Sequence, residues 1–272
     1  MRSSSKIVSF YGAKGGVGKS IIAANFANIL SLYGYKVLLI DLSLGLGNQD
    51  IIFNINNKTN LLGLLKDRLT LEETLIPIKE NLYLITNESG DEIYNYHSNE
   101  IIEKLFSTTT LFDRFDYILL DMPSSISFDA QNFLKLSDEV VIISDPTPIS
   151  LTNSYTNIKI ASNYEKNIHL IFNKVSGSYE SDLIFDKIEN VISKNLKIKD
   201  RLNYLGSISN SKKIEKSTKN RTLFSDKYPN SNASYELDKI IQNFIRKLEQ
   251  KMLNSHRRKG FTASIRSLIE KI

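Results

Sequence analysis

The chain has 272 residues, a net charge of +5 and no cysteine. Without cysteine it cannot hold a thiolate-bound iron–sulfur cluster, and no apolar run reaches the about 18 residues that a membrane-spanning helix needs. Residues 1–5 are too short for a signal peptide, so we expect one large cytoplasmic α/β domain with a sizeable core.

A glycine-rich loop follows the first predicted strand. Residues 7–10 form a short apolar run, and a helical pattern with Phe26 and Leu30 on one face begins after the loop. Strand, glycine-rich turn and helix is the context in which such a loop binds phosphate, with Lys19 near the outer phosphates and the Ser20 hydroxyl suited to Mg²⁺. The residues expected to bind nucleotide are Ala13, Lys14, Gly15, Gly16, Val17, Gly18, Lys19, Ser20 and Ile21.

A second lysine, Lys14, lies early in this loop. The run Lys-Gly-Gly-Val-Gly-Lys-Ser, which ends at Ser20, resembles the deviant Walker A motif of the MinD/ParA family of ATPases. The resemblance implies ATP as the ligand, catalytic roles for Lys14 and Lys19, and an ATP-dependent homodimer in which Lys14 reaches the partner's nucleotide. The alternative is a solvated loop charge, since most lysines are exposed.

The apolar run of residues 37–40 predicts a central parallel strand that ends in Asp41. Residues 42–50 resemble switch I of the family, and Gly-Leu-Gly-Asn within them resembles the flagellar number regulators, the FlhG, YlxH or FleN subgroup. The family pattern is Asp-x-Asp, whose second carboxylate orients the attacking water. Here that position is Ser43, whose hydroxyl can hydrogen-bond a water but is no base at neutral pH. We therefore expect slow hydrolysis.

The next part of the chain carries few chemical signals. Residues 59–80 predict one or two short helices broken at Pro77, and residues 82–85 predict another strand. The polar residues 87–98 are expected to form a loop, followed by a helix near residues 100–107.

A further apolar run, residues 117–120, ends in Asp121 and is followed by Met-Pro-Ser-Ser, which resembles switch II. The resemblance implies that Asp121 binds the Mg²⁺ shell, so the expected metal site comprises Ser20, Asp41 and Asp121. The family has Gly near Ser125. The alternative for Asp121 is a helix cap.

Residues 140–143 predict another core strand, and the Pro-rich residues 145–155 after it again resemble the flagellar subgroup. The family commonly has Asp where this chain has Asn153. The strand predicted over residues 168–172 leads to Asn173, whose amide offers a donor and an acceptor that match adenine. We therefore expect Asn173 to bind the base.

The last predicted elements are a charged helix over residues 181–194 and a strand over residues 202–206. Residues 207–213 occupy the place of the family's adenine loop. Residues 228–234 resemble the subgroup's Tyr-Pro-x-Ser-x-Ala-Ser turn, which precedes a helix expected to run to about residue 252.

The alternation of strands and helices predicts a doubly wound, mainly parallel sheet of the P-loop NTPase type, with ATP and Mg²⁺ at the carboxyl ends of the strands. The resemblance implies a dimerising regulator of flagellar number or placement, with a FlhF-like GTPase and switch-complex components as partners. A division-site MinD, a DNA-partitioning ParA and a nucleotide-binding scaffold with negligible turnover remain as alternatives.

We divide the chain into an ATPase domain, residues 1–250, and a basic amphipathic tail, residues 251–272. Residues 249–272 carry a net charge of +4, so the rest of the chain is nearly neutral. Within the tail, apolar residues share a single helical stripe that follows the basic residues 256–259; the stripe comprises Phe261, Ile265, Leu268, Ile269 and Ile272. We expect residues 256–272 to bind an anionic membrane surface on the inner face of the cell membrane, and no nucleic acid. The alternatives are a helix docked on the body and a frayed terminus.

Overall fold

The computed structural model describes residues 5–43, 47–56, 59–87, 92–106, 110–123, 126–127, 130–196, 198 and 201–269, without the side chains of residues 94, 110 and 251–269. The strands are β1 (Lys6–Gly12), β2 (Val37–Asp41), β3 (Ile76–Lys79), β4 (Leu82–Ile85), β5 (Tyr117–Asp121), β6 (Glu139–Ser144), β7 (Asn167–Val175) and β8 (Leu202–Ser209).

These strands form one 8-stranded sheet in the order β3-β4-β2-β5-β1-β6-β7-β8. Every neighbouring pair is parallel except β3 and β4, which are antiparallel. The strand β1 therefore lies near the middle of the sheet, between β5 and β6. This arrangement confirms the predicted doubly wound, mainly parallel fold.

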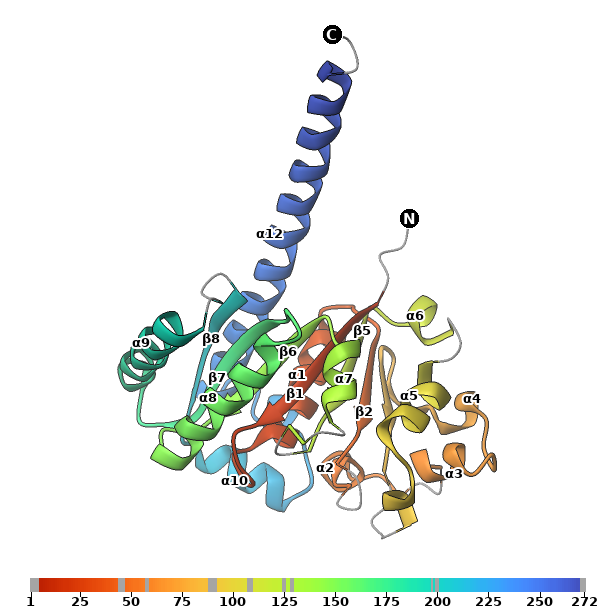
Figure 1. Cartoon of the computed structure of the whole chain (residues 1–272). Helices are drawn as coiled ribbons and strands as arrows, with labels where there is room; N and C mark the ends of the chain where they lie inside the picture. The colour runs from red at the N-terminus through yellow and green to blue at the C-terminus, as the bar shows by residue number, and fades with distance from the viewer. Residues whose placement is uncertain are drawn as a thin grey trace.

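Helices cover both faces of the sheet (Figure 1). They are α1 (Lys19–Leu32), α2 (Gln49–Phe53), α3 (Leu61–Leu65), α4 (Leu71–Thr74), α5 (Ser98–Phe106), α6 (Thr110–Arg114), α7 (Gln131–Leu136), α8 (Pro148–Ser162), α9 (Ser178–Asn195), α10 (Lys212–Lys219), α11 (Phe224–Lys227) and α12 (Asn232–Ile269), with a 3₁₀ turn at Glu92–Asn95.

Alternating residues of the central strands pack into two separate core layers, one on each face of the sheet. Val8 and Phe10 of β1 belong to a layer that also contains apolar side chains of α1 and α12. Ile7 and Tyr11 belong to the opposite layer, with apolar side chains of α5, α7, α8 and α9. Since strands buried on both faces read as continuous apolar runs, the sequence located most of them.

The structure corrects the prediction of helices over residues 59–80. It contains the short helices α3 and α4, and then residues 76–79 form β3 at the edge of the sheet, with Pro77 inside it. An edge strand tolerates proline because one side of it needs no partner for a backbone N–H. The proline that was expected to break a helix therefore lies in a strand. Likewise, residues 92–95 form a 3₁₀ turn within the predicted loop.

The C-terminal helix also differs from the prediction. Instead of ending near residue 252, α12 runs unbroken through Gly260 to Ile269 and leaves the body of the molecule as a rod (Figure 1). One internal glycine costs a helix only about 1 kcal/mol relative to alanine, and no proline interrupts this stretch. The apolar stripe of the tail lies outside the described side chains. In the described part of the chain, no helix is long and apolar enough to cross a membrane.

Candidate nucleotide and metal site

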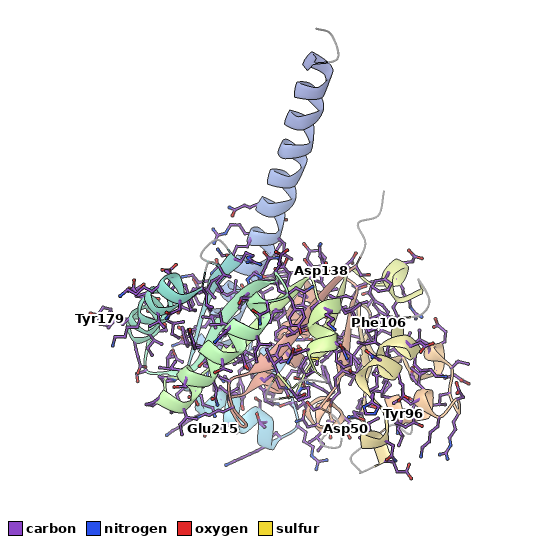
Figure 2. All side chains as sticks on the ribbon, in the orientation of Figure 1. Asp50, Tyr96, Phe106, Asp138, Tyr179 and Glu215 are labelled. Carbon is purple, nitrogen blue, oxygen red and sulfur yellow. The ribbon has the colours of Figure 1, made fainter. Side chains whose placement is uncertain are left out.

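The residues predicted to carry the chemistry meet at the edge formed by the carboxyl ends of the parallel strands. Parallel pairing aligns the ends of β1, β2 and β5, and Asp41 is the register partner of Asp121. In Figure 2, Asp50 and Glu215 lie along this edge of the body, whereas Asp138, at the amino end of β6, lies on the opposite side, from which α12 projects. The site and the rod are therefore at opposite ends of the strands.

The loop between β1 and α1 has the backbone that phosphate binding requires. Gly16 and Gly18 have φ angles of +73° and +96°, in the left-handed region that favours glycine. Gly18 is the N-cap of α1 and has no side chain that could cap the helix. A Cβ at Gly15 or Gly16 would meet nothing within 4 Å, so the loop has an open face beside the positive end of α1.

Lys19 is buried at the inner side of this loop. Its side chain is 6% exposed, its Nζ donates a hydrogen bond to Ser20 Oγ at 3.1 Å, and it forms an ion pair with the fully buried Asp121. The sequence predicted these residues to act together, and the structure brings them into contact.

Asp41 is surrounded by the backbone of the segment that follows it. Its carboxylate accepts hydrogen bonds from the N–H groups of Ser43 (3.0 Å), Asn48 (2.9 Å) and Gln49 (3.0 Å). Burial and the neighbouring charge of Asp121 raise the pKa of Asp41 well above its usual range, although these three hydrogen bonds oppose the shift. Two buried carboxylates side by side favour a cation between them.

Gln49 is a site residue that the sequence analysis missed. Its side-chain Nε2 donates to Asp121 Oδ2 at 2.7 Å and to the backbone oxygen of Ser20 at 3.2 Å, and the residue is fully buried. A polar residue directly after the Gly-Leu-Gly-Asn segment was the available signal. Its contacts depend on how Asp41 folds that segment back, which the sequence pattern does not reveal.

Lys14 lies at the outer side of the loop. Its Nζ is 2.8 Å from Asp145 Oδ2 and 2.9 Å from Thr147 Oγ1, and its side chain is 31% exposed. Burial tends to raise the pKa of Asp145, but the hydrogen bonds from Lys14 and Thr147 outweigh it and hold this pKa below its usual range. Lys14 is therefore no freely solvated loop charge in this conformation, because its own chain holds it.

Asn173 contacts the loop itself. Its Nδ2 donates to the backbone oxygen of Val17 at 2.8 Å, its Oδ1 accepts from the N–H of Lys174 at 2.9 Å, and a Cβ at Gly18 would lie 2.4 Å from its Nδ2. In this conformation, the Nδ2 group expected to read adenine supports the loop, and the Oδ1 atom is engaged by the next residue of β7. Base binding by Asn173 stays a prediction.

The remaining predicted residues line or flank this edge. Ala13 and Val17 are buried under the loop, Ile21 is half-buried in the first turn of α1, and Asn153 is exposed on α8. In the expected adenine loop, residues 207–209 extend β8, and α10 begins at residue 212. Ser125 lies outside the described residues.

The donors at this edge fit a nucleotide with Mg²⁺. Within the described residues, no group of three or more His, Cys, Asp or Glu side chains could hold a metal ion. Mg²⁺, however, is usually bound by one or two carboxylates together with waters and the oxygens of a bound phosphate. Asp41, Asp121 and the Ser20 hydroxyl are such a partial set, beside an uncapped helix start and Lys19.

Comparison with known proteins agrees with this geometry. The AAA_31 family, described as an AAA domain, matches residues 5–172. The flagellum site-determining protein YlxH of Helicobacter pylori is 34% identical over 249 residues, which cover 91% of this chain and 84% of YlxH. The chain belongs to the MinD/ParA family. Within that family it belongs to the YlxH subgroup, as the switch I segment indicated.

Two further relatives support this placement in the MinD/ParA family. The antiactivator FleN of Pseudomonas aeruginosa is 24% identical over 240 residues, covering 87% of this chain and 85% of FleN. The crystal structure of a ParA family ATPase from Chlorobium tepidum superposes with a TM-score of 0.73 at 26% identity, covering 88% of this chain and 98% of that chain. The resemblance therefore extends over nearly the whole fold.

Proposed function

We propose that this protein is an ATP-dependent regulator of flagellar number or placement that switches between a monomer and a nucleotide-bound homodimer. The observation that carries the proposal is that two ion pairs, Lys14–Asp145 and Lys19–Asp121, meet at the carboxyl ends of the strands. They do so in a chain that resembles YlxH over 84% of that protein's length. The resemblance to FleN supports the flagellar role. A FlhF-like GTPase and switch-complex components are the partners that the resemblance implies.

Each part of the site has a distinct task in this proposal. The loop N–H groups, the start of α1 and Lys19 hold the phosphates, and Ser20, Asp41 and Asp121 hold Mg²⁺. When bound, Mg²⁺ supplies positive charge that stabilises the charge developing on the phosphate oxygens. Asn173 keeps Gly18 and Val17 in place and contacts the base.

Lys14 connects nucleotide binding to dimer formation. In the monomer, it is held by Asp145 and Thr147 at the outer side of the loop. In the dimer, Lys14 exchanges these partners for the phosphates bound to the second copy. The Lys14 side chain is 31% exposed, so the exchange costs less than breaking a fully buried pair would, and a doubly charged phosphate competes well.

Hydrolysis is slow in this proposal. Ser43 provides only its backbone N–H to Asp41 among the described contacts, and its hydroxyl replaces a carboxylate that would orient water. The same observation favours a second candidate, a nucleotide-binding scaffold with negligible turnover. Single-turnover hydrolysis of labelled ATP separates the two, because a scaffold retains its ATP while a slow ATPase converts it completely.

The tail brings the dimer to an anionic membrane surface. Residues 256–259 provide His and three basic side chains, and the predicted stripe after them is apolar. One such short segment binds weakly, whereas a dimer that presents two gains about 10²–10⁴ in avidity without new contacts. ATP occupancy thereby controls attachment, and the protein is peripheral on the inner face of the cell membrane.

The test is sedimentation with anionic liposomes in ATP or ADP. Wild type should sediment more in ATP, whereas Ile265→Glu and a 1–259 truncation should stay in solution. Ser267→Glu is the matched control, because it adds the same charge on the opposite side of the predicted helix and should sediment like wild type. Binding that is unchanged by the truncation, or capture of the tail by DNA in place of lipid, would contradict the membrane role.

A further inference from the structure

Gln49, the first residue of α2, contacts all three residues predicted to hold the metal. Its backbone N–H donates to Asp41 Oδ2 at 3.0 Å, and its side-chain Nε2 donates to Asp121 Oδ2 at 2.7 Å and to the Ser20 backbone oxygen at 3.2 Å. The segment after β2, the loop after β1 and the end of β5 are thus joined through one fully buried side chain.

The amide of Gln49 has one unused polar atom. Its Nε2 is engaged by the two oxygens above, whereas its Oε1 is buried and has no hydrogen-bond partner within the part of the chain that the structure describes. Burying an acceptor without a partner costs free energy, so such atoms in native proteins call for a specific reason. An amide needed only for packing could be replaced by an apolar side chain of the same length.

We propose that Gln49 is a positioning residue for Mg²⁺: its Nε2 orients Asp121 toward the ion, and its Oε1 accepts a hydrogen bond from a water bound to it. This inference rests on the proposed binding of nucleotide with Mg²⁺ at this edge. Residues that hold a metal ligand in place are frequently worth about 10–100-fold in metal affinity. The chain lacks a second carboxylate at Ser43, and Gln49 provides a polar side chain from six residues further along.

The contacts define what Gln49 does and what it leaves to others. Lys19 neutralises Asp121 through Oδ1, while Gln49 binds the other oxygen, Oδ2, so the carboxylate is fixed on both sides. A carboxylate fixed in this way loses little further freedom when a cation binds. Gln49 therefore acts on the affinity for Mg²⁺ and not on the loop's hold on phosphate.

The experiment is an Mg²⁺ titration of the full chain with a fluorescent, non-hydrolysable ATP analogue, which requires no turnover. Gln49→Met keeps the length of the side chain and removes its hydrogen bonds. We expect the Mg²⁺ concentration at half-saturation to rise about 10-fold or more, with affinity for the analogue without Mg²⁺ changed by less than about twofold. Gln49→Asn, which withdraws the amide by one methylene, should raise it by a smaller factor.

Gln131→Met is the matched control. It removes a similar carboxamide, whose Oε1 accepts from the Tyr164 hydroxyl at 2.6 Å, away from the site. We expect wild-type Mg²⁺ dependence from this variant. Thermal melting without ligand reports any general loss of stability separately for each protein.

The outcomes separate this inference from the function on which it rests. If wild type binds no ATP analogue, the proposed function fails. If wild type binds it in an Mg²⁺-dependent way and Gln49→Met and Gln49→Asn do the same, the role of Gln49 is refuted. An equal loss of analogue affinity with and without Mg²⁺ would also refute it, because it would show a purely structural role in the loop.

Discussion

The two lysines of the glycine-rich loop differ in burial and in partner, and we expect them to differ in function. Lys19 is 6% exposed and paired with the fully buried Asp121, whereas Lys14 is 31% exposed and paired with Asp145 at the rim. Removing one partner of a buried pair leaves an uncompensated charge and costs about 3–5 kcal/mol. In the outer pair Asp145 is buried, but the Lys14 ammonium is partly open to solvent, so this pair is worth less. The inner lysine is therefore fixed, and the outer one is free to change partners.

The largest expected effect is at the inner lysine. Lys19→Ala removes charge-assisted hydrogen bonds to phosphate and leaves Asp121 unpaired, so we expect at least about a 100-fold loss of affinity for an ATP analogue, measured by equilibrium fluorescence. Lys104→Ala, which removes an exposed ion pair with Asp67, is the control. If Lys19→Ala binds as tightly as wild type, the assignment of the inner lysine to phosphate is wrong.

The outer lysine should affect a different quantity. In Lys14→Ala, the monomer should keep its affinity for nucleotide, while ATP-dependent dimerisation weakens by about 10–100-fold, as expected for a lost charge-assisted hydrogen bond. Analytical ultracentrifugation with the non-hydrolysable analogue measures this. Lys36→Ala, an exposed lysine at the amino end of β2, should dimerise normally. Unimpaired dimers in Lys14→Ala would remove the contrast between the two lysines.

A carboxylate added beside the inner pair should accelerate turnover. Ser43→Asp restores a group that can orient water, and we expect at least about a tenfold higher rate of ATP hydrolysis out of the 10²–10⁴-fold that such groups supply. Ser43→Asn has nearly the same size without the charge and should not accelerate. Rapid turnover by wild type would itself contradict the proposed role of this position.

The smallest expected effect tests the restraint on Lys14. Asp145→Asn keeps the shape of the side chain and removes the charge that holds the Lys14 ammonium group. Because the pair is partly exposed, we expect ATP-dependent dimers to be tighter by no more than about fivefold. Sedimentation velocity at several protein concentrations measures the change. Weaker dimers would indicate that Asp145 supports the dimer and does not compete with it.

The two lysines also show what the sequence could predict. The strand, loop and helix around Lys19 are local, so the apolar run and the glycines sufficed to predict these elements. The partner of Lys14 is Asp145, at the end of a strand that pairs with β1, and this contact exists only in the folded sheet. Local patterns located the glycine-rich loop, and tertiary contacts determined which partner the outer lysine has.

The same distinction explains the missed elements. Residues 76–79 are too short, and Pro77 too misleading, for a pattern to reveal an edge strand; only pairing with β4 creates it. Gln49 reads as an ordinary polar residue, and its role follows from the three backbone N–H groups that turn its segment around Asp41. Asn173 was predicted to bind the base, but its contact with the backbone of Val17 was not predicted.

The rod formed by α12 has a consequence for how the molecule meets its surroundings. Leu248 still packs against the body, and a straight helix rises about 1.5 Å per residue, so the part from there to Ile269 extends about 30 Å further. If a surface holds the far end of the rod, as proposed for the tail, the carboxyl ends of the strands face away from that surface. A tail bound to a surface would then not obstruct the exchange of nucleotide or of a partner at the site.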